Sequence, residues 1–112
     1  MKFIEKPLNK QEIDNLQKQY GNYLKLTVDV TQEILVAGGE LHADGEIILL
    51  EEGSHQKDIW GGGIDLSTKT IDTTAILNLR PNQNNESIEI LDPKIRDRFN
   101  KIVKKVFNKL WN

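Results

Sequence analysis

The first half of the chain carries two different hydrophobic periodicities. Apolar residues recur at helical spacing over 10–20, and Asn9 followed by Glu12 forms the capping-box pattern that begins a helix. Residues 23–30, YLKLTVDV, alternate strictly between apolar and polar, which predicts a half-buried strand. The continuous apolar run at 34–37 predicts a central strand, and the short turn between the two runs predicts a hairpin.

The second half of the chain predicts one helix, two strands and a final helix. Residues 43–52 predict a helix, and the strand expected over 58–66, DIWGGGIDL, contains three successive glycines. Such glycines indicate a bulge, a bend, or a backbone that something else approaches closely. Residues 71–80 predict a further strand. Asp92 and Pro93 are a favourable N-cap and first residue for a last helix, whose apolar stripe extends to 111.

These elements predict a single α+β domain over residues 1–112, in the order β-α-β-β-α-β-β-α. The sheet is expected to be mainly antiparallel and four-stranded, with a short extra edge strand at residues 3–4. We expect all three helices to lie on one face of this sheet.

Composition narrows the class of protein. A chain of 112 residues with 38% hydrophobic residues is ordinary for a soluble domain, and it contains no apolar run long enough for a membrane helix. The absence of cysteine excludes disulfides, thiolate metal sites and a cysteine nucleophile. The first ten residues lack the apolar core of a signal peptide, so a cytoplasmic protein is expected.

Charge is distributed unevenly along the chain. Residues 93–112 carry seven Lys or Arg and one acid, whereas residues 1–92 carry eight Lys or Arg and sixteen acids. A basic last helix that lies on an acidic body is the simplest interpretation, and lysines also suit the C-terminal end of a helix. A nucleic-acid contact is not favoured, because the body is acidic and the lysines lack interspersed aromatic residues.

The segment GGELHAD, residues 38–44, contains one of only two histidines. Glu40, His42 and Asp44 together could hold a metal through one nitrogen and two oxygens. The alternative is structural: two glycines turn the chain, His42 begins the next helix, and the negative charge of Asp44 is favourable at the positive end of the helix dipole. The second histidine, His55, follows the end of that helix and is not expected to share an ion with His42.

A second polar group is expected where the strand over 71–80 ends. Asn78 and Arg80 are two residues apart, so a strand would place them on one face, and Arg80 could hold an anion bidentately. The alternative is a salt bridge from Arg80 to an acid. Strand directions place Arg80 near Ser54, Gln56 and Trp60, at the opposite end of the sheet from GGELHAD. Two separate polar clusters are therefore expected, and the Arg80 cluster is the better ligand pocket.

Four segments of the chain stand out: GGELHAD, GSHQKDIWG with the pattern GSxQxxxWG, LRP followed by Asn and Ser, and LDPKIRDRF. Together they resemble a small family of prokaryotic proteins known only as a domain of unknown function. The resemblance covers nearly the whole chain, but it implies no activity, cofactor or partner. It implies that the following are recurring family positions: Glu40, His42, Asp44, Ser54, Gln56, Trp60, Asn78, Arg80 and Asn85.

The function expected from these observations is a small-ligand or partner-binding accessory module, and an enzyme is not favoured. The ligand candidates are Ser54, Gln56, Trp60, Asn78, Arg80 and Asn85. One alternative is a small metal-dependent hydrolase that uses Glu40, His42 and Asp44. Another is a protein-interaction module that uses the basic last helix. No nucleotide or serine-hydrolase motif is present, and neither the cofactor nor the oligomeric state follows from the sequence.

Overall fold

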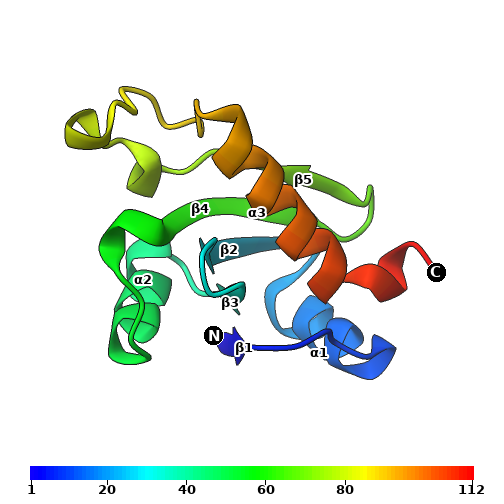
Figure 1. Ribbon diagram of the computed structural model, residues 1–112. Coiled ribbons are helices and arrows are strands. Elements are labelled where there is room, and N and C mark those ends of the chain that lie inside the picture. The colour runs from blue at the N-terminus through cyan, green and yellow to red at the C-terminus, as the bar shows by residue number, and fades with distance from the viewer.

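A computed structural model describes residues 1–112 and shows a five-stranded antiparallel sheet with strand order β1-β3-β2-β4-β5 (Figure 1). The expected single α+β domain and its element order are confirmed, including the short edge strand. The strands are β1 (Lys2–Ile4), β2 (Tyr23–Asp29), β3 (Ile34–Ala37), β4 (Ile59–Asp65) and β5 (Thr70–Asp72), and the helices are α1 (Lys10–Tyr20), α2 (His42–Glu51) and α3 (Pro93–Val106). None of the helices combines the length and the apolar character needed to cross a membrane.

The helices cover both faces of the sheet, so the expectation that they share one face is wrong. Leu24, Leu26 and Val28 of β2 are fully buried in the core that α1 and α3 complete. Thr27, which points the other way, lies against α2, where its hydroxyl donates to the His42 carbonyl. Figure 1 shows α2 on the opposite side of the sheet from α1 and α3. The cause is that β3 and β4 are apolar on both faces, and each face needs a cover.

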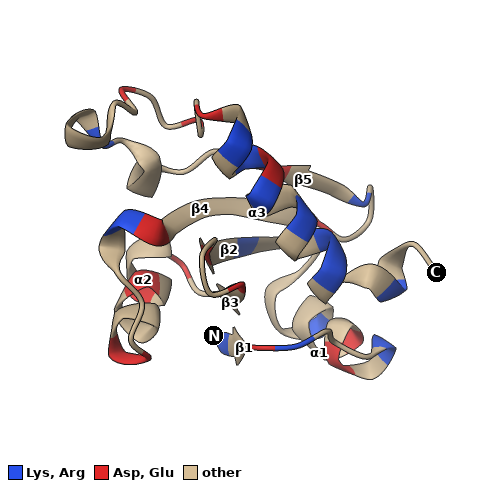
Figure 2. Ribbon diagram, viewed as in Figure 1, with Lys and Arg blue, Asp and Glu red and all other residues tan.

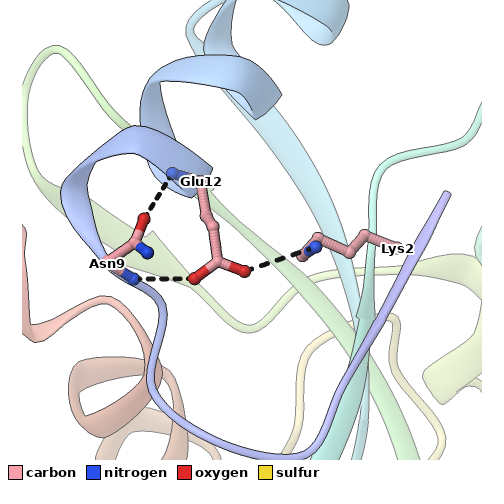
Figure 3. A network of polar contacts seen from close by, with 3 residues as sticks. All are labelled: Lys2, Asn9 and Glu12. Atoms are coloured by element: carbon pink, nitrogen blue, oxygen red, sulfur yellow. Dashed lines mark hydrogen bonds and ion pairs between the residues drawn. The ribbon is translucent and has the colours of Figure 1, made fainter.

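The N-terminal strand is tied to the beginning of α1 by the expected capping box (Figure 3). The Asn9 side chain accepts from the Glu12 N–H at 2.8 Å, and the Glu12 carboxylate accepts from the Asn9 N–H at 3.0 Å. The other Glu12 oxygen lies 3.5 Å from the Lys2 ammonium of β1. The bond from Asn9 is the main cause of a lowered Glu12 pKa, and the nearby Lys2 also lowers it.

The strand expected over 71–80 ends much earlier, at Asp72. The chain then leaves the sheet, forms single bridges between Thr74 and Glu89 and between Arg80 and Asn85, and makes 3₁₀ turns at Ile76–Asn78 and Pro81–Gln83. The side chain of Asn78 explains the difference, because it bonds both the N–H and the carbonyl of Gly61. A side-chain amide thus satisfies the β4 backbone where a longer neighbouring strand would have done so.

The two later helices begin close to where the sequence indicated. Helix α2 starts at His42 with Asp44 in its first turn, and the Asp92 side chain caps α3, which begins with Pro93. Helix α3 ends earlier than expected, at Val106, and a 3₁₀ turn at Asn108–Leu110 follows. Its apolar stripe nevertheless continues through the buried Phe107 into the core.

Candidate functional site

Strand β4 carries three glycines because other groups approach its backbone closely, which is one of the three explanations that the sequence left open. Its register with β2 is continuous, so there is no bulge. A β-carbon at Gly62 would lie 2.3 Å from the Asp72 carbonyl oxygen, and one at Gly63 would lie 2.0 Å from the Tyr23 hydroxyl. At Gly61 it would lie 2.7 Å from Ala75 and 3.0 Å from the His42 ring. The glycines therefore admit groups from both faces of the sheet.

The Arg80 side chain lies at the beginning of β4 and donates hydrogen bonds to main-chain carbonyls, not to a carboxylate. Its guanidinium donates to the carbonyls of Leu77 at 3.1 Å and Gln56 at 2.9 Å, and also to that of Ile59. The same group lies 4.5 Å from the centre of the Trp60 ring. Burial lowers its pKa, and Glu46 of α2 opposes that effect. The salt bridge that was the alternative interpretation of Arg80 is not formed, whereas Arg80 does lie close to Gln56 and Trp60, as expected.

Asn78 is a buried cross-link between β4 and the segment that follows β5, and Asn85 is a buried cross-link within that segment. The Asn78 amide group donates to the carbonyls of Gly61, Thr73 and Ile88, and its oxygen accepts from the Gly61 N–H. Asn85 donates to three carbonyls and accepts from one N–H in the same way. In each amide, three carbonyls therefore share the two N–H groups, and the oxygen accepts one backbone N–H.

Ser54 belongs to a different network, centred on the buried carboxylate of Asp29. The Ser54 hydroxyl donates to Asp29 at 2.6 Å, and the same carboxylate accepts from the Thr31 and Gln32 N–H groups. Gln56 contributes only its carbonyl, to Arg80. Four of the six ligand candidates have side chains bonded within the chain, a pattern that favours a structural role: Ser54, Asn78, Arg80 and Asn85.

GGELHAD turns the chain as the sequence indicated. Gly38 and Gly39 have φ angles of 91° and 90°, a conformation that glycine adopts at no steric cost. Glu40 is exposed, and its carbonyl accepts a bond from Lys25. Glu40, His42 and Asp44 do not converge on one point, and no group of three His, Asp or Glu side chains does so elsewhere. The geometry therefore lends no support to a metal centre in this segment.

His42 has one nitrogen fixed and one nitrogen free. Its Nε2 lies 2.7 Å from the Gly62 carbonyl oxygen, and because a carbonyl can only accept, Nε2 carries the hydrogen. Nδ1 is then a lone-pair acceptor, which has no partner within the chain and is not buried. Burial is the main cause of a lowered His42 pKa, the Gly62 carbonyl opposes it, and the nearby Lys25 adds to it. The ring is therefore neutral at pH 7.

A groove of about 430 Å³ lies beside His42. It is lined by Lys25, Leu41, His42, Ala43, Ala75, Ile76 and Leu77. Five of these residues are apolar, and the two others are a lysine and a neutral histidine. The groove therefore offers both apolar contacts and polar groups to a ligand. Leu41 is 61% exposed and Ile76 is 82% exposed, so the groove presents large apolar side chains to solvent. A volume of this size is in the range of small-molecule sites.

The His42 groove and the Arg80 cluster are adjacent rather than at opposite ends of the sheet, contrary to the expected separation. His42 lies against Gly61, and Asn78 bonds the backbone of the same residue.

Comparison with protein families finds a match over residues 2–106 to a family described as a protein of unknown function, DUF5674. The chain belongs to this family. No curated protein and no solved structure matches it.

Sequence reasoning missed most of the groove in this DUF5674 domain. It singled out His42 but not Lys25, which lines the groove from β2. It also missed the apolar walls, which come from the beginning of α2 and from residues 75–77. The composition of α2 gave a separate signal, which concerns residues that do not line the groove. Ile47 and Leu50 lie on its outer side and are 55% and 43% exposed, whereas Leu49 is fully buried against the sheet. A helix that is apolar on both sides usually has both sides covered.

Proposed function

We propose that this domain is a binding module that holds a small amphiphilic anion in the groove beside His42. The observation that carries the proposal is the combination of apolar walls with a lysine ammonium and an unpaired imidazole nitrogen. Ligand sites are commonly apolar clefts with a small number of placed polar groups. This groove is next to the Arg80 cluster but is lined by other residues.

The polar groups specify the head of the ligand. The Lys25 ammonium donates to the Glu40 carbonyl and has further N–H groups for a carboxylate or a similar anion. Nδ1 of His42 accepts from a hydroxyl or an N–H next to that anion. Because His42 is neutral, it adds no positive charge, and Lys25 alone selects the sign of the ligand.

The walls specify the rest of the ligand. Leu41, Ala43, Ala75, Ile76 and Leu77 offer no side-chain hydrogen bond, so a hydrocarbon chain or ring fits them. Covering Leu41 and Ile76 removes apolar surface from water at about 25 cal/mol per Å². The ligand class is therefore a medium-length carboxylic acid or an aromatic acid, in which one end is charged and the other apolar.

The test uses octanoate, with octylammonium and octanol as probes of the same chain but different charge. Each is titrated against the ¹⁵N-labelled domain, and amide shifts are followed by NMR. Octanoate is expected to shift the amides of Ala43, Ile76 and Leu77 and to bind more tightly than the other two probes. Lys25→Met should weaken octanoate by about tenfold, the effect of one charge-assisted bond.

The matched control is Lys18→Met, because Lys18 is exposed on α1, on the other face of the sheet. It should leave octanoate binding unchanged. Equal binding of octanoate and octylammonium would contradict the role of Lys25, as would equal effects of the two lysine variants. Shifts that avoid the groove would exclude it as the site.

A further inference from the structure

The basic part of the chain forms an exposed surface along α3 and its C-terminal turn. Figure 2 shows Lys and Arg along the outer side of α3, and the segment 93–112 has a net charge of +6. Lys101 and Lys105 are paired with Asp97 and Glu33 at 3.0 and 3.8 Å. Lys104 forms no ion pair, so its charge is available to a partner.

Trp111 lies within this surface, between two shallow hollows. One hollow, of about 340 Å³, is lined by Lys104, Asn108, Trp111 and Asn112. The other, of about 300 Å³, is lined by Lys69, Ile71, Asn100, Lys104 and Trp111. Trp111 is 42% exposed, unlike Trp60, which is 2% exposed. The two hollows share Lys104 and Trp111, so an indole and a free cation stand together at their junction.

Lys69 reaches this place from the turn between β4 and β5, far from α3 in the sequence. It also forms no ion pair. The sequence alone argued against nucleic acid because the body is acidic and no aromatic residue stood among the lysines. Folding answers the second objection, since it places Trp111 beside lysines from two separate segments.

We propose that this surface binds single-stranded nucleic acid, with one base stacked on Trp111 and the adjoining phosphates at Lys69 and Lys104. Base stacking on an exposed aromatic ring next to backbone-tracking cations is the usual way in which single strands are held. The Asn100 and Asn108 amides lie in the hollows on either side and can donate to and accept from base edges. An acidic protein would use the cations but would have no need of the indole between amide-lined hollows.

The test measures fluorescence anisotropy of labelled oligo-dT and oligo-U of about 15 nucleotides, a length that exceeds one site. At low salt the full chain should bind both, and log K should fall linearly with log salt. Trp111→Ala should weaken binding by about tenfold, the usual effect of one stacked base. The double variant Lys69→Gln/Lys104→Gln should make the salt dependence shallower, because two phosphate contacts are lost.

The control is Lys10→Gln/Lys18→Gln, which removes the same charge from the exposed side of α1. It should bind as the unmodified chain does. Absence of oligonucleotide binding at low salt overturns the proposal, and so does an equal loss in the two double variants. Binding to vesicles that contain phosphatidylglycerol, without binding to either oligonucleotide, assigns the surface to a lipid instead. Circular dichroism of each variant confirms that the fold is retained, and octanoate binding should be unaffected.

Discussion

The guanidinium of Arg80 lies over the indole of Trp60, 4.5 Å from the ring centre, and it is buried without a carboxylate partner. A buried cation is costly unless its donors are bonded, and here the donors are occupied by main-chain carbonyls. Those carbonyls belong to Leu77, Gln56 and Ile59. The side chain therefore fixes the segment after β5 to the beginning of β4, and through it the wall of the groove beside His42.

Replacing Arg80 with lysine should destabilise the domain by about 3 kcal/mol, because an ammonium can neither reach the same three carbonyls nor stack in the same way. Urea unfolding followed by circular dichroism measures the change. Arg98→Lys is the matched control, since Arg98 is exposed on α3, and it should change stability by less than about 0.5 kcal/mol. Equal midpoints for the two variants would mean that the carbonyl contacts of Arg80 contribute nothing.

The glycines of β4 should differ in their tolerance of alanine. At Gly62 a β-carbon meets the Asp72 carbonyl and the Phe99 ring, neither of which can move freely, so Gly62→Ala should cost about 3 kcal/mol. At Gly63 the three nearest atoms all belong to the Tyr23 side chain, which is 42% exposed and can swing outward. Gly63→Ala should therefore cost less and should break the 2.6 Å bond from Tyr23 to Asp72.

A double-mutant cycle checks this interpretation. Adding Tyr23→Ala should largely remove the cost of Gly63→Ala, because the clashing ring is gone, but should leave the cost of Gly62→Ala unchanged. Thermal unfolding of the two single glycine variants, Tyr23→Ala and the two doubles provides the cycle. Additive effects at Gly63 would show that the Tyr23 ring is not the obstacle.

The partly buried His42 ring should make stability depend on pH. Its pKa is lowered from the ordinary value of 6.5, so the unfolded chain takes up a proton at a higher pH than the folded one. The stabilising effect of the neutral ring is therefore complete above about pH 6.5 and is lost as the pH falls through the lower, folded pKa. Unfolding free energies from pH 7.5 to 5 should decline for the native chain. In His42→Asn the decline should be shallower by the contribution of one titrating group, and an identical slope would contradict a lowered His42 pKa.

Asn78 is fully buried, and its amide donates to three carbonyls. Asn78→Asp keeps the shape but replaces the donor with an acceptor, so it should destabilise the domain by about 3 kcal/mol at pH 7. The loss should shrink toward pH 4, because a protonated carboxyl regains one donor. Asn84→Asp, at an exposed left-handed turn position that aspartate tolerates, is the control. Chemical unfolding at both pH values separates the two outcomes.

Much of the architecture follows from local pattern. The alternation of β2, the capping signals of Asn9 and Asp92 and the apolar stripe of α3 each act within a few residues, so they predicted the elements and their order. The glycines at 38 and 39 were correctly interpreted as a turn for the same reason. Other features depended on pairing that periodicity does not encode. The strand expected over 71–80 ended at Asp72 because the Asn78 side chain, distant in sequence, took the backbone groups of Gly61.

What the sequence determined by itself was the inventory of helices and strands, the single α+β domain and the chemical types of the candidate residues. Which face each helix covers, and which polar groups are bonded within the chain, depend on packing between residues far apart in the sequence. Arg80, Asn78 and Asn85 have the composition of a ligand site, but folding directs them to main-chain carbonyls. His42 retains a free nitrogen because Gly62 occupies only one side of its ring. Residue type sets what a side chain can bond, whereas long-range packing determines which of those bonds remain for a partner.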